Sequence, residues 1–395
     1  MRIGLFSDTY APDINGVVSS IVTLQHALEA LGHEVFVIAN QPRLFKRAYD
    51  GKILRLSGLE LKWMYGYTMT SPFQHSAVKT IKAMNLDIIH AHTEFGVGIY
   101  ARNVAKKLNL PLVSTYHTTY EDYTHYINPL HVKPVEKTLR KMVAKLSKYF
   151  SERGHAVIAP SAKTKAMLEG YGIKCPIHVI PTGLDLKRFD KKASSLEAIK
   201  ALRQSLGFTD DTFVILFVGR LAEEKAIDLV IEGFSSVDRQ KLNAKLVIVG
   251  GGPDDHRLQT LTKSLNLEND VIFTGKKPSA EVPLFYHSAD AFVSASLTET
   301  QGMTFIEALA AECPLFARPD DVLTELVIEE KTGYYFTSPQ EFAEKVAHHI
   351  AKPQAERDAM KKAARDQVLI YDDREFGKAV ADVYQQTIDD YKNQS

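Results

Sequence analysis

The chain is poor in cysteine, in net charge and in long apolar runs. Two cysteines, Cys175 and Cys313, in 395 residues exclude a disulfide framework and a cysteine-rich zinc site. Lys plus Arg and Asp plus Glu are equal at 48 each, so no overall electrostatic attraction to nucleic acid is expected. No uncharged apolar run approaches the roughly 18 residues of a membrane-spanning helix, and the start of the chain lacks the apolar segment of a signal peptide. We expect a soluble, cytoplasmic protein, with association at a membrane surface left open.

The sequence does contain a long alternation of strand-like and helix-like segments. Strand candidates lie at residues 3–6, 35–38, 87–90, 110–114, 156–159, 178–180, 213–218, 245–249, 271–274, 289–294 and 314–317. Such alternation predicts an α/β fold with right-handed parallel crossovers, that is, a doubly wound sheet.

The strand series is interrupted between Pro181 and about Asp211, and five or more strand candidates lie on each side. Two Rossmann-like halves fit this pattern better than one sheet of ten or more strands. We expect domains at 1–185 and 186–371, with a C-terminal helix near 372–395 that packs back on the first. Ligands of doubly wound sheets bind outside the carboxyl ends of the strands, so two such halves predict an interdomain cleft.

The segment LTETQGMTFIEALAA, residues 297–311, holds two carboxylates eight residues apart, Glu299 and Glu307. A strand-like run precedes it and a helical pattern follows. Gly302 marks a close backbone approach, and the amides that follow it open a helix, where anions bind. One acid beside a sugar, amides on phosphate and a second acid beside a ribose would form a nucleotide-sugar clamp. The alternative is a helix entry with two solvated glutamates.

Two further strand-end loops of the second half carry phosphate-binding residue types. Arg220 and Lys225 flank a helix entry, where they offer a forked donor and a point charge to a diphosphate. Cations at a helix N-terminus oppose the helix dipole, which weakens the alternative that they are ordinary surface residues. Gly250 and Gly251 begin a glycine run that suits either phosphate proximity or a tight turn.

In the first half, the loop after the first strand contains Asp13 and Gly16, where backbone could meet phosphate or sugar. His117 follows another strand and is expected to face the cleft, although a single histidine is more often structural. His90, His92 and Glu94 resemble a metal site in composition, but no further spaced ligand supports it, and we expect no metal. A polar and aromatic segment after His117 resembles an acceptor loop. The candidate acceptor residues are Asp13, Tyr120, Asp122 and Tyr126.

Taken together and in this order, these motifs resemble the family 4 retaining glycosyltransferases of the GT-B fold, over nearly the whole chain. The matching features are the Arg220/Lys225 pair, the Glu299-to-Glu307 spacing, the Gly16 loop, His117 and the segment PTGLD at 181–185. The resemblance implies transfer of a sugar from a nucleotide diphosphate sugar with retained anomeric configuration. It implies no tightly bound cofactor and no essential metal.

The resemblance also implies roles for individual residues. Arg220 and Lys225 would hold the diphosphate, Glu299 the sugar hydroxyls and Glu307 the ribose. The catalytic residues would be His117, Arg220, Lys225 and Glu299. The donor-binding residues would be Gly16, Arg220, Lys225, Gly250, Gly251, Glu299, Gly302, Met303, Thr304 and Glu307. The chain departs from the family at Ala226, where glycine is frequent, and at Thr300-Gln301, where an aromatic residue is frequent.

The segments TETQGMT, STYHTTYEDYTHYI and FARPDDVLTELVIEEKTGYYF are similar to the bacterial 1,2-diacylglycerol 3-alpha-glucosyltransferases within this family. That similarity implies UDP-glucose as donor, membrane diacylglycerol as acceptor, and peripheral association with the inner face of the cell membrane. Alternatives are another nucleotide sugar, a soluble, polymeric or phosphatidylinositol-type acceptor, or an isomerase or phosphorylase on the same scaffold. The sequence leaves the oligomeric state open.

A segment at 133–150 has the pattern of an amphipathic helix that could bind anionic lipid. Its cations share one arc, and apolar residues occupy the opposite arc. A second candidate is the aromatic segment around Trp63, which suits a membrane interface. Both could equally belong to the packed protein. The candidate membrane residues are Trp63, Lys137, Arg140, Lys141, Lys145 and Lys148.

Overall fold

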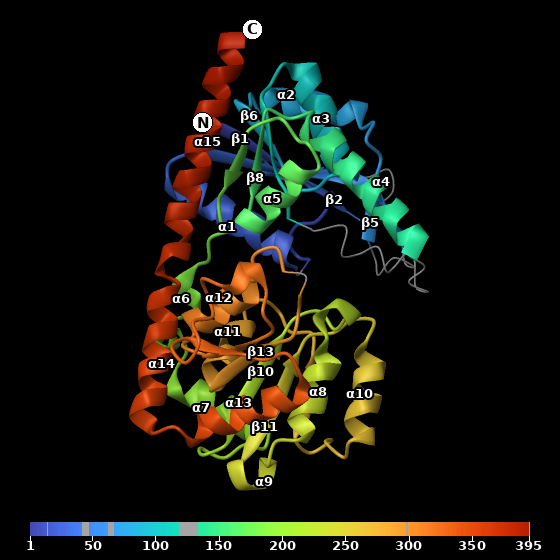
Figure 1. Ribbon diagram of the computed structural model, residues 1–395. Helices are drawn as coiled ribbons and strands as arrows, with labels where there is room; N and C mark the ends of the chain where they lie inside the picture. Colours follow the sequence, from blue (N-terminus) through green and yellow to red (C-terminus); the bar gives the residue numbers. More distant parts are fainter. Residues whose placement is uncertain (14, 42–46, 62–66, 118–132, 298, 395) are drawn as a thin grey trace. The chain divides into compact units, whose positions relative to one another are not determined.

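The computed structural model describes residues 1–13, 15–41, 47–61, 67–117, 133–297 and 299–394. These residues divide into two compact units, one formed by 1–183 with 373–395 and the other by 184–372 (Figure 1). Each unit has its own sheet, mostly parallel in the first unit and parallel throughout in the second. Among the described residues, no helix combines the length and apolarity required to cross a bilayer.

The first unit contains a nine-stranded sheet in the order β3-β4-β2-β1-β6-β7-β8-β9, with β5 paired to β4. Its strands are β1 (Arg2–Ser7), β2 (Glu34–Gln41), β3 (Ala48–Tyr49), β4 (Ile53–Leu61), β5 (Tyr67–Thr70), β6 (Ile88–Ala91), β7 (Leu112–Thr115), β8 (Ala156–Ala159) and β9 (Ile177–Val179). Its helices are α1 (Gly16–Ala30), α2 (His75–Ala83), α3 (Gly96–Leu108), α4 (Lys133–Ser151), α5 (Ala162–Gly170) and α15 (Asp373–Gln394). The strands pair in parallel except β3 and β5, which run antiparallel to β4.

Helix α15, red in Figure 1, joins the end of the chain to the first unit. Val380, Val383 and Tyr384 of α15 share a buried cluster with Ile21 and Leu24 of α1. Apolar residues at a spacing of three to four in both helices produce this contact, because they lie on one face of each helix.

The second unit contains a six-stranded sheet in the order β12-β11-β10-β13-β14-β15, parallel throughout. Its strands are β10 (Phe213–Val218), β11 (Ala244–Val249), β12 (Val271–Gly275), β13 (Ala291–Ser294), β14 (Leu315–Ala317) and β15 (Gly333–Tyr335). Its helices are α6 (Leu186–Phe189), α7 (Leu196–Ser205), α8 (Ile227–Ser235), α9 (Arg239–Leu242), α10 (Asp255–Ser264), α11 (Val282–Ser288), α12 (Met303–Ala310), α13 (Pro339–Ala351) and α14 (Gln354–Gln367).

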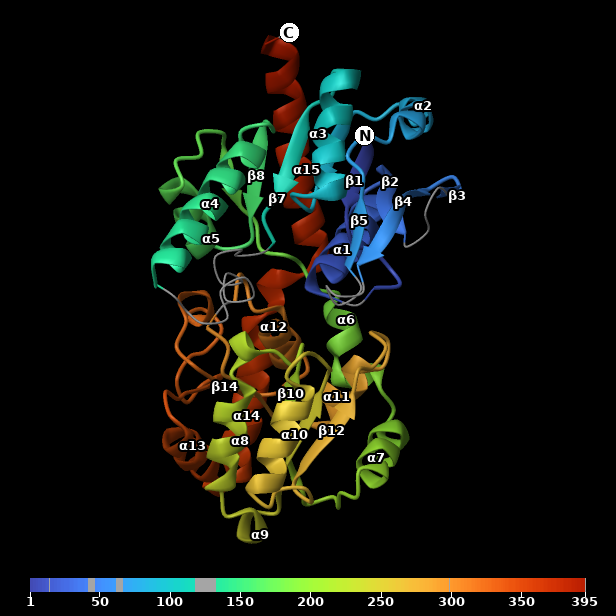
Figure 2. The same cartoon turned by 90° about the vertical axis from the view of Figure 1, so that its right-hand side faces the viewer.

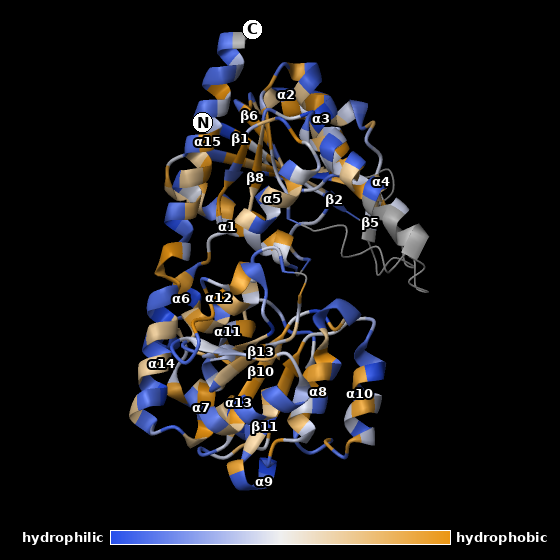
Figure 3. Ribbon diagram, in the orientation of Figure 1, coloured by the Kyte–Doolittle hydropathy of each residue, from blue (hydrophilic) through white to orange (hydrophobic). Residues whose placement is uncertain are grey.

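Both faces of the second sheet are covered, which explains the continuous apolar run of β10. Val214 and Leu216 pack with α11 and α12 on one face, whereas Ile215 and Phe217 pack with α8 and α13 on the other. Figure 2 shows α8 and α10 lying together over the sheet, and Figure 3 shows these helices with alternating apolar and polar stripes. The chain order reverses between β10 and β13, so the carboxyl ends of these two strands form a topological switch point.

Candidate functional site

The loop after β10 carries Arg220 and Lys225 at the switch point of the second sheet. A short 3-10 helix, Glu223–Lys225, lies between the strand and α8. Arg220, 40% exposed at its side chain, forms an ion pair with the nearly buried carboxylate of Glu224. Lys225 Nζ lies 2.7 Å from Oε1 of Glu299, which follows the neighbouring strand β13. Residues 74 positions apart in the sequence thus meet because parallel neighbours end at the same edge.

The glycines after β11 allow two loops to lie against each other. Gly250 has a φ of +150°, and a Cβ added there would fall 1.8 Å from the carbonyl oxygen of Gly219. The amide of Gly219 donates to the carbonyl of Val249 (3.0 Å), and the amide of Asp254 donates to that of Leu221 (3.0 Å). The glycine run therefore supports the loop that carries Arg220. Packing between the loops thus accounts for the glycine run, and the contact of Gly250 and Gly251 with a donor stays a prediction.

Gly302 opens α12 in the left-handed conformation, with a φ of +79°. Its carbonyl accepts from the amides of Phe305 (3.0 Å) and Ile306 (3.2 Å), which closes the first turn. Met303 and Thr304 are the first two residues of the helix. The first amides of a helix have no carbonyl partner within the helix, so this turn suits an anion or a sugar oxygen.

Glu307 lies in α12 and is held by Tyr286 of α11. The Tyr286 hydroxyl lies 2.9 Å from Oε2 of Glu307 and 3.2 Å from the Thr304 carbonyl oxygen. Burial raises the pKa of Glu307 to about 7, although the hydrogen bond from Tyr286 favours the ionised form. The carboxyl group of Glu307 accepts hydrogen bonds from hydroxyl groups best when it is deprotonated. The contribution of Tyr286 could not be read from the sequence, because it depends on how α11 packs against α12.

His117, in the first unit, belongs to a largely buried array of histidines, in which His90 lies in β6, His92 follows β6 and His117 follows β7. Its Nε2 lies 3.0 Å from Nδ1 of His92, and the His92 ring is 4.0 Å from that of His90, centroid to centroid. His90 Nδ1 lies 2.5 Å from the hydroxyl of Tyr384, and its Nε2 lies 2.7 Å from Thr115 Oγ1. Burial lowers the pKa of His117 to about 4 and that of His90 to about 3, so both are neutral at pH 7.

The sequence placed these histidines at strand ends but did not reveal the array. No group of three or more His, Cys, Asp or Glu suited to a metal ion occurs within the part of the chain that the structure describes. His92 Nε2 is buried without a hydrogen-bond partner among these residues. His92 therefore fixes His117 through a single hydrogen bond between their rings.

The loop before α1 is organised by side-chain hydrogen bonds. Asn15 caps the helix by accepting from the amide of Val18 (3.0 Å), and its amide group donates to Thr9 Oγ1 (2.9 Å). Thr9 in turn donates to Asp13 (2.9 Å). Gly16 is exposed, and a Cβ added there would meet no atom of the described residues within 4 Å. Packing within the first unit therefore does not explain the glycine, whereas close approach of a ligand would.

Helix α4 exposes part of its apolar surface. Met142 and Tyr149 are each 49% exposed and Leu146 is 37% exposed. Lys141 and Lys145 are also exposed, whereas Lys148 lies 3.8 Å from the carboxylate of Glu152. The apolar arc therefore does not pack entirely on the sheet. The side chains of Lys137 and Arg140, and the residues Trp63, Tyr120, Asp122 and Tyr126, lie outside the described part of the structure.

The chain matches known families over almost its whole length. Residues 14–188 match "Glycosyltransferase Family 4", and residues 198–367 match "Glycosyl transferases group 1". Two similar proteins are named alpha-monoglucosyldiacylglycerol synthase. The one from Acholeplasma laidlawii is 36% identical, covering 90% of this chain and 89% of that protein. The one from Streptococcus pneumoniae is 34% identical, covering 97% and 85%.

Solved structures show the same fold at low sequence identity. Sucrose-phosphate synthase from Thermosynechococcus elongatus has a TM-score of 0.76 and 20% identity, covering 98% of each chain. Anabaena HepE in complex with UDP and glucose has a TM-score of 0.75 and 19% identity, covering 98% of this chain and all of that one. The two doubly wound sheets are thus those of the GT-B fold. The chain belongs to glycosyltransferase family 4, and it is a retaining hexosyltransferase of that family.

Proposed function

We propose that the protein transfers glucose from UDP-glucose to the 3-hydroxyl of 1,2-diacylglycerol and makes an alpha-linked product. The observation that carries this proposal is the similarity, along nearly the full length, to two proteins named alpha-monoglucosyldiacylglycerol synthase. In this proposal the second unit binds the donor, and the first unit binds the acceptor and the membrane.

The geometry at the switch point supports donor binding by the second unit. Glycosyl transfer needs stabilisation of a diphosphate leaving group, and fixed cations provide it without reorganisation. Lys225 Nζ is held 2.7 Å from Glu299 Oε1. Lys225 can therefore contact phosphate while Glu299 accepts hydrogen bonds from the sugar hydroxyls. The amides of Met303 and Thr304 would contact phosphate or sugar, and the carboxylate of Glu307 would bind the ribose.

The reaction in this proposal needs no carboxylate nucleophile and no metal. Retaining glycoside hydrolases place two carboxyl groups about 5 Å apart around the reacting bond. Here Glu299 is engaged by Lys225 and Glu307 by Tyr286. We propose a front-face displacement, in which the departing phosphate oxygen assists removal of the acceptor proton. Arg220 and Lys225 supply the positive charge, and His117 and Gly16 serve the sugar and the phosphate from the first unit.

The test is transfer of radiolabelled sugar into chloroform-extractable lipid in the presence of diacylglycerol vesicles. UDP-glucose, UDP-galactose, UDP-N-acetylglucosamine and GDP-mannose are compared as donors. GDP-mannose is included because a GDP-mannose-dependent alpha-mannosyltransferase from Corynebacterium glutamicum is 29% identical over 80% of this chain. The proposal predicts label only from UDP-glucose and an alpha anomeric coupling in the proton NMR spectrum of the product. Preferred transfer from GDP-mannose would contradict the proposed donor, and transfer into a soluble acceptor would contradict the proposed acceptor.

We further propose that α4 brings the enzyme to anionic membrane. Met142, Leu146 and Tyr149 recur at a spacing of three to four, so they form one exposed stripe on the helix. Lys141 and Lys145 are exposed on the same helix. An apolar stripe bordered by cations suits a helix that lies in the membrane interface, and each cation near an anionic surface adds about 1 kcal/mol.

Co-sedimentation with vesicles of increasing phosphatidylglycerol content tests this membrane proposal. The double variant Lys141→Glu/Lys145→Glu is expected to bind vesicles several-fold more weakly and to use embedded diacylglycerol more slowly. Transfer to a short-chain, water-soluble diacylglycerol should remain. Lys79→Glu/Lys82→Glu on α2 is the matched control, because both lysines are exposed in the same unit. Equal sedimentation of the two double variants would contradict the proposal that α4 contacts the membrane.

A further inference from the structure

Arg318 lies at the same edge of the second sheet as the donor residues. It follows Ala317, the last residue of β14, which pairs with Ser294, the last residue of β13. The order β10-β13-β14 therefore places three consecutive strand ends side by side, followed by Arg220, Glu299 and Arg318 respectively. Neighbouring strands are about 4.8 Å apart, which is within the reach of an arginine side chain.

The alternation of β14 directs Arg318 towards the α8 side of the sheet. Phe316, two residues earlier, packs in the same buried cluster as Ile227 of α8, whereas Ala317 packs in the cluster on the opposite face. Residues two apart in a strand share a face. Lys225 lies just before α8. Arg318 and Lys225 therefore belong to the same face and the same edge of the sheet.

Arg318 is partly buried, and its interactions are incomplete. Its Nε is shielded from solvent and has no hydrogen-bond partner among the residues that the structure describes. Across the described ranges, its guanidinium forms no hydrogen bond, ion pair or ring contact with another residue. The nearby Asp320 accepts from the amide of Val322 (3.0 Å). A shielded donor without an acceptor is costly, and such groups in native proteins call for a specific explanation.

The two cations of the loop after β10 already have carboxylate neighbours. Arg220 is paired with Glu224, and Lys225 is paired with Glu299. Arg318 therefore contributes positive charge that these ion pairs do not offset. A guanidinium offers a planar fork of donors that matches phosphate oxygens.

We propose that Arg318 is a third cationic contact for the diphosphate of the nucleotide-sugar donor. The inference rests on the proposed function, because it takes the donor to be a nucleotide diphosphate sugar bound at this edge. In the occupied site, a phosphate oxygen accepts the hydrogen bond that the shielded Nε lacks. Arg318 is thus part of the donor-binding machinery, on the β14 side of Lys225.

The experiment compares the binding of UDP and of uridine, by titration calorimetry and ligand-observed NMR, to the full chain and its variants. Arg318→Met should weaken UDP binding about tenfold or more, as expected for the loss of a charged hydrogen bond. Uridine, which lacks the diphosphate, should bind as it does to the wild type. Arg318→Lys should recover part of the UDP affinity, because it restores the charge without the fork.

Arg357→Met is the matched control. Arg357 also has a shielded Nε that lacks a partner in the described part of the chain, but it lies in α14 and donates to Gln354 through Nη2. This control should leave the affinity for UDP unchanged, and thermal unfolding of every variant establishes that it is folded.

Two results would overturn the proposal for Arg318: unchanged UDP affinity in Arg318→Met, or an equal loss of affinity for UDP and uridine. The wild type is first titrated with UDP, GDP and ADP. If it prefers GDP or ADP, the proposed donor is wrong, and the same comparison with that nucleotide and its nucleoside decides the role of Arg318. If it binds none of the three, both proposals fail.

Discussion

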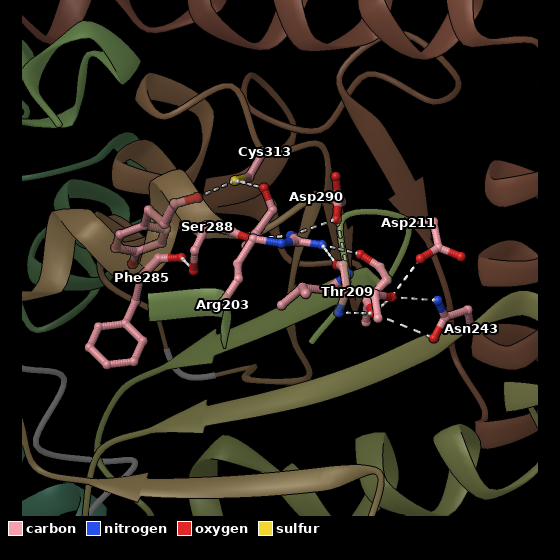
Figure 4. A network of polar contacts seen from close by, with 12 residues as sticks. Arg203, Thr209, Asp211, Asn243, Phe285, Ser288, Asp290 and Cys313 are labelled. Carbon is pink, nitrogen blue, oxygen red and sulfur yellow. Dashed lines mark hydrogen bonds and ion pairs between the residues drawn. The ribbon is translucent and has the colours of Figure 1, made fainter. Parts of the chain in front are cut away.

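The second sheet uses arginine in opposite ways at the amino-terminal ends of its strands, here called the amino edge, and at their carboxyl-terminal ends, the carboxyl edge. At the amino edge, Arg203 of α7 donates to the carbonyl oxygens of Ser288 (2.7 Å), Thr209 (3.2 Å) and Thr212, and it lies 3.6 Å from Asp290 (Figure 4). At the carboxyl edge, Arg318 has no such partners within the described residues. The first arginine ties segments of the chain together, whereas the second offers donors to a ligand. The two arginines share a residue type. They differ in their place on the sheet and in whether their hydrogen bonds are satisfied, and these differences separate the two roles.

The largest expected effect is the loss of catalysis at the carboxyl edge. Arg220→Ala and Lys225→Ala should each lower kcat/KM for glucose transfer about a hundredfold or more, because each removes positive charge from the developing diphosphate. Each substitution also takes that cation from a mostly buried carboxylate, Glu224 or Glu299, so the free energy of unfolding should fall by about 1–3 kcal/mol. Steady-state transfer and urea unfolding measure the two quantities. Near-normal transfer by both variants would contradict the assignment.

The amino edge should show the reverse behaviour. Arg203→Ala leaves several carbonyl groups without their donor, so the free energy of unfolding should fall by about 2–4 kcal/mol. Transfer per folded molecule should remain close to that of the wild type. A variant that kept its stability but lost turnover would instead place a functional residue at the amino edge.

A smaller effect is expected in the pH dependence of donor use. Because the pKa of Glu307 is about 7, lowering the pH from 8 to 6 protonates most of this carboxyl group and weakens its acceptance of ribose hydroxyls. The donor KM should then rise by up to about tenfold. Tyr286→Phe removes a hydrogen bond that stabilises the carboxylate, so it should move this rise to higher pH. A pH profile that is identical in the variant and the wild type would exclude Tyr286 from this role.

The same pKa has a consequence for stability. The folded protein binds a proton at Glu307 that the unfolded chain, with a pKa near 4.5, has already released. Stability contributed by this group is therefore present at low pH and is lost as the pH rises from about 4.5 through 7. The free energy of unfolding of Glu307→Gln, taken as the difference from the wild type, should therefore be about 1–3 kcal/mol higher at pH 8 than at pH 5. Denaturant titrations at the two pH values test the sign.

The smallest effect concerns the backbone of the β10 loop. Ala226 adopts the left-handed conformation, with φ of +46° and ψ of +45°, which costs an L-residue about 1–2 kcal/mol. Ala226→Gly should raise the free energy of unfolding by about 0.5–1 kcal/mol, after the greater freedom of glycine in the unfolded chain is counted. Ala222→Gly is the control on the other side of the same 3-10 helix, where φ is −147°, and it should be destabilising. Equal effects at both positions would contradict the conformational explanation.

The fold class was predictable because apolar periodicity alternates along the chain. Runs such as FVILFV of β10 are apolar throughout because helices cover both faces of the sheet. The prediction omitted β4, the antiparallel strands β3 and β5 that pair with it, and β15, a strand of three residues. A hairpin at the end of a parallel series breaks the strand-helix alternation on which the prediction rested. A strand of three residues is too short to show a period.

The candidate site was predictable only as a set of loop positions. The sequence indicates that Lys225 and Glu299 follow strands, but their ion pair depends on β10 and β13 being neighbours, which spacing does not reveal. The contact between His90 and Tyr384 spans 294 positions and depends on the return of α15 to the first unit. Arg318 was within a segment noted for its family resemblance, yet its missing partners became visible only in three dimensions.

Hydrogen exchange of backbone amides, with and without UDP, tests the central contrast between the two edges most directly. We expect increased protection at 219–226, 250–254, 299–304 and 318–322, the loops at the carboxyl ends of β10, β11, β13 and β14. We expect unchanged exchange at 209–212, 243 and 288–290, which precede β10, β11 and β13. Protection confined to the amino edge, or absent from all four carboxyl-edge loops, would contradict the assignment of donor binding to this edge of the sheet.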